Sequence, residues 1–207
     1  MATAVRFDDA TETVAIPRVV RSALILGVVQ ALCVLLVSLV NRSLAGVPDM
    51  ALTGVVVALG AAATIFLPAM WIRPRSIDGV GACAGIGIGA ALAFLLIDVF
   101  VLQPIGTYTN RWHEIGGGSN WWYHPVWWML SCYLAWMGGW IGANNARRSA
   151  GLANAALMVA VFAVVFGAIA AIVRFPGATW SVATFAIAVL PALAATTFIT
   201  DRIARRS

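Results

Sequence analysis

Charged residues are scarce in this chain of 207 residues: they make up 10% of it, whereas hydrophobic residues make up 62%. An ordinary soluble domain carries about 25% charged and about 45–50% apolar residues. So little charge cannot cover so much apolar surface with a water-soluble shell. The composition therefore excludes a soluble enzyme, a disordered protein, a collagen-like fibre and a disulfide-stapled secreted domain. It predicts a polytopic membrane protein.

Three other residue types are missing or rare. The chain has no lysine, so all thirteen positive charges are arginine, and it has only two histidines and three cysteines. Cys33, Cys83 and Cys132 lie inside apolar runs without C-x-x-C or zinc-type spacing, which predicts small core thiols. The arginines lie at the ends of apolar runs and form no basic stripe, so we expect no nucleic-acid partner.

Long apolar runs dominate the rest of the sequence. A membrane-spanning helix needs about 20 mostly apolar residues, because the hydrocarbon layer is about 30 Å thick. Helices satisfy their own backbone hydrogen bonds in lipid, so an all-α bundle of six transmembrane helices is expected. The six predicted spans are Ser22–Val40, Met50–Ile72, Gly79–Leu102, Trp121–Ala143, Leu152–Val173 and Trp180–Thr200.

The arginines beside these spans predict the orientation of the bundle. With the N-terminus inside, ten arginines are cytoplasmic and only Arg42, Arg111 and Arg174 are outside. We therefore expect both termini in the cytoplasm and a multi-pass protein of the inner (plasma) membrane. Residues 1–21 form a short cytoplasmic segment, 22–200 the membrane domain with one longer outer loop at 103–120, and 201–207 a basic cytoplasmic tail. The ten inner arginines are Arg6, Arg18, Arg21, Arg73, Arg75, Arg147, Arg148, Arg202, Arg205 and Arg206.

Glycines recur at helical spacing in the third and fourth predicted spans. Small residues four apart form a smooth stripe on which another helix can pack closely in lipid. The stripe predicts helix packing, either inside this bundle or against another subunit. Its members are Gly81, Gly85 and Gly89 in the third span and Gly138 and Gly142 in the fourth.

Aromatic residues concentrate at one outer corner. The outer loop and the fourth span hold seven of the nine tryptophans and all three tyrosines. Tryptophan and tyrosine favour the headgroup level of a bilayer, which predicts an aromatic belt. Because the belt is lopsided, we also expect this corner to face a partner or ligand. The candidate contact residues are Asp98, Arg111, Trp112, Trp121, Trp122, Tyr123, His124, Trp127 and Trp128.

Polar chemistry converges on the same corner. Asp98 is the only charged residue well inside a predicted span, and such a carboxyl group usually faces a partner or water. One interpretation pairs it with Arg111 or a tyrosine hydroxyl. The other makes Asp98, His113, Glu114 and His124 a site for a metal ion or a proton relay.

The corner is slightly similar to the six-helix subunits of copper-dependent membrane monooxygenases, in which an Asp and two His hold a metal. That family places Asp and His one helical turn apart. In this chain Asp98 and His113 are fifteen residues apart, so the chain is not assigned to the family.

Three functions from different classes fit this pattern. The first is an accessory or scaffolding subunit of a larger membrane complex, because glycine stripes, an asymmetric interfacial corner and short loops serve assembly rather than catalysis. The second is a transporter or binding protein for a small amphipathic molecule or lipid. The third is a membrane redox protein that bears a metal or cofactor. No particular cofactor is indicated, and no catalytic residue is identified; the expected partners are the lipid bilayer and other membrane subunits.

Overall fold

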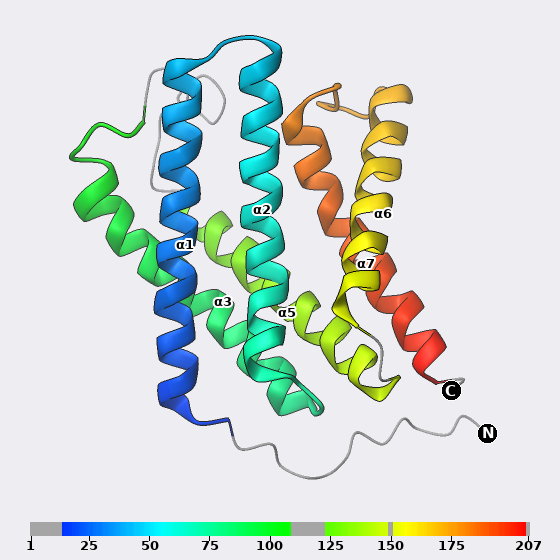
Figure 1. Ribbon diagram of the computed structural model, residues 1–207. Helices are drawn as coiled ribbons and strands as arrows, with labels where there is room; N and C mark the ends of the chain where they lie inside the picture. The colour runs from blue at the N-terminus through cyan, green and yellow to red at the C-terminus, as the bar shows by residue number, and fades with distance from the viewer. Residues whose placement is uncertain (1–13, 109–122, 149–150, 206–207) are drawn as a thin grey trace.

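The computed structural model describes residues 14–108, 123–148 and 151–205, and all of their regular secondary structure is helical (Figure 1). Predicted site residues Arg111, Trp112, His113, Glu114, Trp121 and Trp122 lie outside these ranges. Tyr123 and His124 open a helix, but their side chains lie outside the described part. The helices are α1 (Ile16–Ser43), α2 (Val47–Ile72), α3 (Ile77–Ile97), the π-helix η1 (Asp98–Leu102), α5 (Tyr123–Arg147), α6 (Leu152–Ile172) and α7 (Val182–Ala204).

Local signals at the helix ends agree with these bounds. Proline occupies the first turn of α1 and of α2, where its missing N–H costs nothing. The Ser76 hydroxyl accepts a hydrogen bond from the N–H of Gly79 and caps α3. Arg73 ends α2 in the left-handed conformation, and Pro74 follows it, so the helix cannot continue.

Five helices in the described part are long and apolar enough to cross a bilayer: α1, α2, α3 continued by η1, α6 and α7. Large apolar side chains point outward from them, among them Leu59, Leu157 and Ile187, each about two-thirds exposed. Such surfaces are costly in water but suit a lipid environment. The fold is therefore that of a multi-pass helical membrane protein.

The remaining long helix, α5, is the fourth in chain order and is not among the five apolar ones. It lies in the middle of the bundle, where it packs against α3, α2 and α7. Buried small and polar residues, including Ser131, Gly138, Asn144 and Asn145, replace the lipid-facing leucines of the other helices. Its weaker apolar character follows from this central position.

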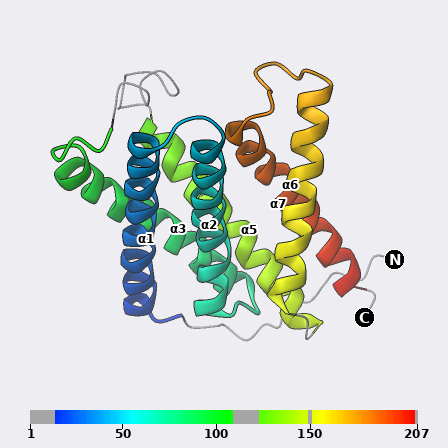
Figure 2. The same cartoon turned by 45° about the horizontal axis from the view of Figure 1, so that its top comes forward.

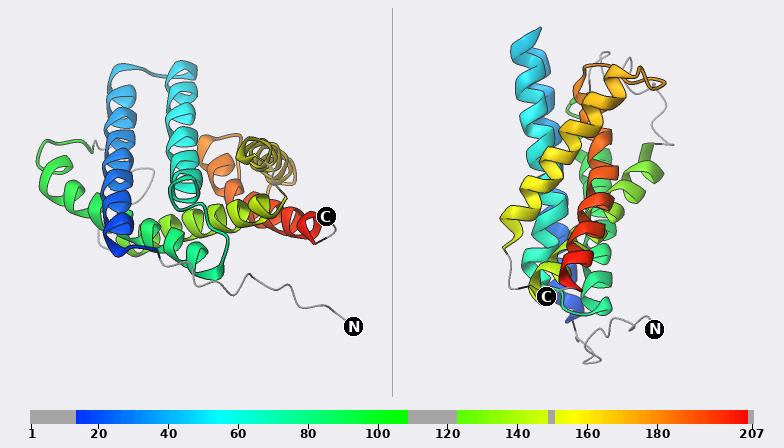
Figure 3. Two further views of the ribbon diagram at one scale, coloured as in Figure 1. Left: turned by 60° about the horizontal axis from the view of Figure 1, so that its bottom comes forward. Right: turned by 90° about the vertical axis from the view of Figure 1, so that its right-hand side faces the viewer.

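Helices that follow one another in the chain run in opposite directions, and α3 and α5 cross obliquely behind the α1–α2 pair (Figures 1 and 2). The start of α1 and the end of α7 therefore lie at the same end of the bundle, which we name the terminal end (Figure 3). The opposite end, where η1 ends, is the loop end. At the terminal end lie Arg18, Arg21, Arg73, Arg75, Arg147, Arg148, Arg202 and Arg205; Arg42 and Arg174 lie at the loop end.

The closest helix contacts occur at glycines. A Cβ atom on Gly138 of α5 would overlap the backbone carbonyl of Ile65 in α2. A Cβ on Gly87 of α3 would lie 2.5 Å from the carbonyl oxygen of Ser131, and one on Gly27 of α1 would lie 2.8 Å from that of Ala90. At these crossings the backbones touch, so packing replaces the hydrophobic attraction that lipid removes.

The five predicted packing glycines differ in what surrounds them. A Cβ on Gly89 would lie 2.8 Å from Cβ of Ala23 in α1, and one on Gly142 would lie 3.1 Å from Cβ of Ala69 in α2. Gly85 is exposed, and a Cβ on it would lie 3.8 Å from Cγ1 of Val19, an ordinary contact distance. Gly81 is exposed with open space around it. Part of the α3 stripe therefore faces away from this bundle.

Candidate functional site

The predicted polar corner is built around Asp98, at the junction of α3 and η1. Its side chain is 1% exposed, and both carboxyl oxygens accept hydrogen bonds. Gln103 donates from Nε2 to Oδ2 at 2.8 Å, and the Tyr108 hydroxyl donates to Oδ1. A tyrosine hydroxyl was one of the two partners expected for this residue. Asp98 therefore binds the segment that follows it.

The π-helix positions these donors. The N–H of Gln103 donates to the carbonyl of Asp98 at 2.9 Å, and that of Thr107 donates to Leu102 at 3.0 Å, each five residues back. Gly106 then reverses the chain with a φ of 69°, a conformation that side-chain-bearing residues rarely adopt. As a result, the chain after η1 folds back and brings Tyr108 to Asp98. Single π-turns of this kind occur frequently at functional sites.

Helix α1 holds the folded-back segment from the other side. The Ser38 hydroxyl donates to the carbonyl of Thr107. The Arg42 guanidinium donates to the carbonyls of Gly106 and, at 3.3 Å, of Thr107. The arginine at the loop end of α1 is therefore engaged in holding the start of the long connection between η1 and α5.

Aromatic side chains close this corner from the α5 side. The Trp127 ring lies 5.3 Å from the Phe94 ring at an angle of 47°, and it packs with Tyr108 against a cluster that contains Leu102. Trp128 is 37% exposed on the same turn of α5. Of the predicted contact residues in the described part, Trp127 thus joins the Asp98 corner, while Trp128 faces outward.

The predicted metal site cannot be traced to its full set of ligands. Within the described residues no group of three or more His, Cys, Asp and Glu side chains could hold a metal ion. Of the four candidate ligands only Asp98 has a described side chain, and both of its oxygens accept hydrogen bonds. His113, Glu114 and the His124 side chain lie outside the described part of the chain, so the metal site stays a prediction.

A second polar cluster lies near the middle of the bundle. Gln30 of α1 donates from Nε2 to the hydroxyls of Thr64 in α2, at 3.2 Å, and of Ser131 in α5, at 3.1 Å. The Ser131 hydroxyl donates in turn to the carbonyl of Gly87 in α3, at 2.8 Å. Four helices are therefore joined by one network, and Gln30 Oε1 is buried in it without a hydrogen-bond partner.

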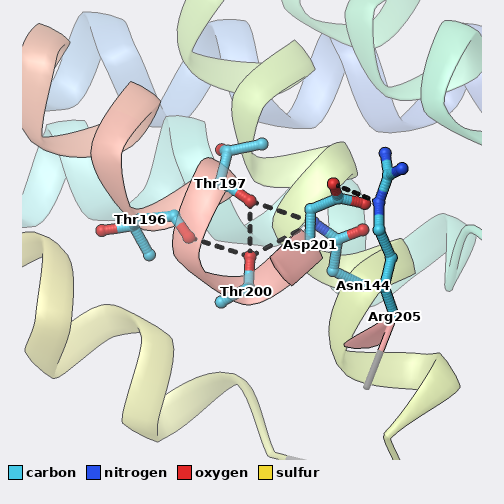
Figure 4. Close-up of polar contacts among 6 residues, drawn as sticks. All are labelled: Asn144, Thr196, Thr197, Thr200, Asp201 and Arg205. Atoms are coloured by element: carbon cyan, nitrogen blue, oxygen red, sulfur yellow. Dashed lines mark hydrogen bonds and ion pairs between the residues drawn. The ribbon is translucent and has the colours of Figure 1, made fainter. Parts of the chain in front are cut away.

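A third cluster joins α5 to α7 at the terminal end (Figure 4). Asn144 is fully buried and donates from Nδ2 to the Thr200 hydroxyl at 3.2 Å and to the Thr197 carbonyl at 3.3 Å. Thr200 donates to the carbonyls of Thr196 and Thr197, and Asp201 accepts from Arg205 Nε at 2.8 Å. Together these contacts fix the end of α5 against the end of α7.

Sequence reasoning passed over several of these residues. Asp49 is buried at the start of α2 and accepts from the Thr53 hydroxyl at 3.4 Å, although the predicted span began one residue later. Asn144 lay just beyond the predicted fourth span, and nothing in its neighbourhood indicated a partner 56 residues away. Gln30 and Ser131 were visible as polar residues within spans, but their pairing was not.

Comparison with protein-family models, with curated proteins and with solved structures finds no match to this chain. The function is therefore argued from the geometry.

Proposed function

We propose that this protein is an integral membrane accessory subunit that packs against other membrane proteins within a larger complex. The observation that carries the proposal is how its interior polar groups are used. Asp98, Gln30, Ser131 and Asn144 all bind other groups of the same chain. Gln30, Ser131 and Asn144 join helices to one another, and Asp98 ties the segment after η1 to the end of α3. This arrangement supports a structural role, because a conduit or a catalytic site needs polar groups that meet a solute.

The topology we propose has six crossings with both termini in the cytoplasm. Helix α5 has 25 residues, and at about 1.5 Å per residue it is about 37 Å long, enough to span the bilayer. A sixth crossing agrees with the alternation of the helices and with the shared end of α1 and α7 (Figure 1). Among the described residues, eight arginines at the terminal end against two at the loop end support a cytoplasmic terminal end.

The docking face we propose is the outward part of α3 around Gly81 and Gly85. Both residues are exposed, so a neighbouring helix can approach the α3 backbone closely there. Gly81 has open space around it, so a larger side chain at this position leaves the contacts of this bundle unchanged.

The experiment compares complexes extracted in mild detergent from cells that express the wild-type chain, Gly81→Leu or the control Ala58→Leu. Ala58 is exposed on α2, away from the proposed face. We expect the wild type and Ala58→Leu to co-migrate with the same partner chains on native gels, and Gly81→Leu to run as the separate subunit. A wild-type chain that purifies as a stable monomer, or a complex that tolerates Gly81→Leu, contradicts the proposal.

A further inference from the structure

We propose that the exposed face of α7 binds a transmembrane helix of another subunit, one that carries a hydroxyl or carboxamide donor within its apolar span. The feature that carries this proposal is Pro191, which lies inside α7 on its exposed face. The inference rests on the proposed role as a subunit of a larger complex. It adds a second contact face, separate from Gly81 on α3, and the chemistry of the partner.

Helix α7 has a buried face and an exposed face. It packs against α6, α5 and α2, and buried residues recur every four positions from Thr184 to Thr200. The exposed residues recur every three or four positions, so they form a second stripe on the other side of the helix. The members of this stripe are Ala183, Ile187, Pro191, Ala194 and Phe198.

Pro191 leaves one backbone acceptor without its helical donor. Proline has no N–H, so the carbonyl of Ile187, four residues earlier, loses the hydrogen bond that an α-helix supplies. Side chains donate to the α7 carbonyls of Leu190, Thr196 and Thr197, but no described side chain donates to that of Ile187. Ile187 and Pro191 are both exposed, so this acceptor opens onto the outer face of α7.

The depth of this carbonyl places it among lipid tails. Ile187 lies five residues after the first residue of α7, a rise of about 8 Å. Exposed Trp180 and the capping residue Ser181 mark the polar layer just before that helix. Arg202 marks the other polar layer, about 22 Å further along the axis. Because hydrocarbon offers no hydrogen-bond donor, we expect the donor to come from protein.

Small residues give a neighbouring helix access to this acceptor. Ala183 precedes Ile187 by four positions, Ala194 follows Pro191 by three, and both alanines are exposed. In lipid, small side chains let two backbones approach closely, and hydroxyl and amide side chains hydrogen-bond across helices. Neighbouring helices also satisfy backbone groups that proline frees in membrane spans. The exposed face of α7 therefore fits a helix with such a donor.

Pro68 in α2 provides an internal comparison. It frees the carbonyl of Thr64 by the same chemistry. Pro68 and Thr64 are both buried, so the chain itself encloses that carbonyl and a partner helix cannot reach it. Pro68→Ala and Pro191→Ala each restore one N–H, but only Pro191→Ala removes an acceptor from the outer surface.

The first experiment locates the partner helix in intact membranes. A benzophenone amino acid replaces Ala194 of the full chain, and the residue that it joins on illumination is identified. Leu157, exposed on α6, is the control position. We expect Ala194 to join an apolar span with Ser, Thr, Asn or Gln within one turn of the joined residue. A span without such a donor, the same span joined from Leu157, or no joined protein overturns the proposal.

The second experiment tests the hydrogen bond. Cross-linking yield is measured for the wild type, Pro191→Ala and Pro68→Ala, each with the native partner and with a partner whose donor is replaced by alanine. Pro191→Ala should lower the yield about threefold, the effect of an average interhelical hydrogen bond. The partner substitution should add no further loss to Pro191→Ala, and Pro68→Ala should leave the yield unchanged. Additive losses, or equal losses in the two proline variants, overturn the proposal.

Three further comparisons separate the remaining outcomes. If Pro68→Ala fails to fold, Leu157→Ala takes its place as control. Ile187→Cys, in a chain without native cysteines, should resist a water-soluble maleimide after lysis; a reaction means that water reaches this site and overturns the proposal. A complex that Gly81→Leu disrupts but whose cross-linking yield Pro191→Ala leaves unchanged contradicts this inference alone, whereas a wild-type monomer contradicts the proposed function as well.

Discussion

The Tyr108 hydroxyl donates a hydrogen bond to Oδ1 of Asp98, ten residues earlier in the chain. This contact closes the π-turn and ties the start of the long connection between η1 and α5 to the end of α3. Asp98 is the one carboxyl residue well inside a predicted span, and its role here is structural: it holds the segment that follows η1.

Tyr108→Phe is expected to lower the free energy of unfolding by about 1.5–3 kcal/mol, the range for hydrogen bonds to charged acceptors, because Oδ1 of buried Asp98 loses its donor. The measurement is reversible unfolding in mixed micelles. Tyr133→Phe is the control, since the Tyr133 hydroxyl donates to a neutral acceptor, the Leu190 carbonyl at 2.9 Å. Its expected cost is about 0.5–1.5 kcal/mol. Equal effects of the two substitutions contradict the assignment.

Gln30→Met is expected to leave stability unchanged or to raise it. The substitution removes two interhelical bonds worth about 0.6 kcal/mol each. It also removes the buried Oε1, whose unmade hydrogen bond costs about 1–3 kcal/mol. Ser131→Ala should instead be destabilising, because it removes the bond to the Gly87 carbonyl and one of the acceptors for Gln30. The same unfolding assay compares the two variants. If Gln30→Met lowers the free energy of unfolding by more than about 3 kcal/mol, the hydrogen bonds of Gln30 outweigh the cost of its buried Oε1 and the prediction is wrong.

Gly138→Ala is expected to destabilise the protein by about 3 kcal/mol or more, because the added methyl group overlaps the backbone carbonyl of Ile65. Gly81→Ala is the matched substitution with open space around it. It should stabilise α3 by about 0.5–1 kcal/mol through the better helix propensity of alanine. Thermal unfolding of the two variants tests this contrast; comparable midpoints for both would refute the α2–α5 backbone contact.

The proposed topology predicts how introduced cysteines react. In a variant without the three native cysteines, Ser43→Cys at the loop end should react with a membrane-impermeant maleimide in intact cells. Ser207→Cys in the tail should react only after lysis. If both positions react in intact cells, the chain crosses the membrane an odd number of times and α5 is not a crossing.

The existence of the helices could be predicted from the sequence, but their full extent could not. Apolar runs report the part of a helix that can meet lipid, whereas α1 begins at Ile16, before the predicted span, and includes Arg18 and Arg21. The π-helix at Asp98–Leu102 was not predictable, because it depends on hydrogen bonds five residues apart that no apolar pattern records.

The packing glycines show a similar limit. Regular spacing singled out Gly81, Gly85 and Gly89, but a stripe does not reveal which neighbour covers it. The tightest α3 contact is at Gly87, on a different face and against Ser131. Likewise, a carboxyl group among aromatic residues predicted a polar corner at Asp98. Its hydrogen-bond donors, Gln103 and Tyr108, could not be predicted, because they reach Asp98 only when the chain folds back after η1.

The hairpin of α6 and α7 has a consequence for synthesis of the chain. Helix α6 packs mainly on α7, and α7 reaches the other helices chiefly through α5. The network of Gln30 and Ser131 needs only α1, α2, α3 and α5, so it can form while the ribosome is still producing the last hairpin. The Asn144 amide instead donates to Thr197 and Thr200 of α7, so these bonds require the last helix to be in place. The polar contacts therefore divide the bundle into two parts, α1, α2, α3 and α5 on one side and the α6–α7 hairpin on the other, and Asn144 of α5 links them.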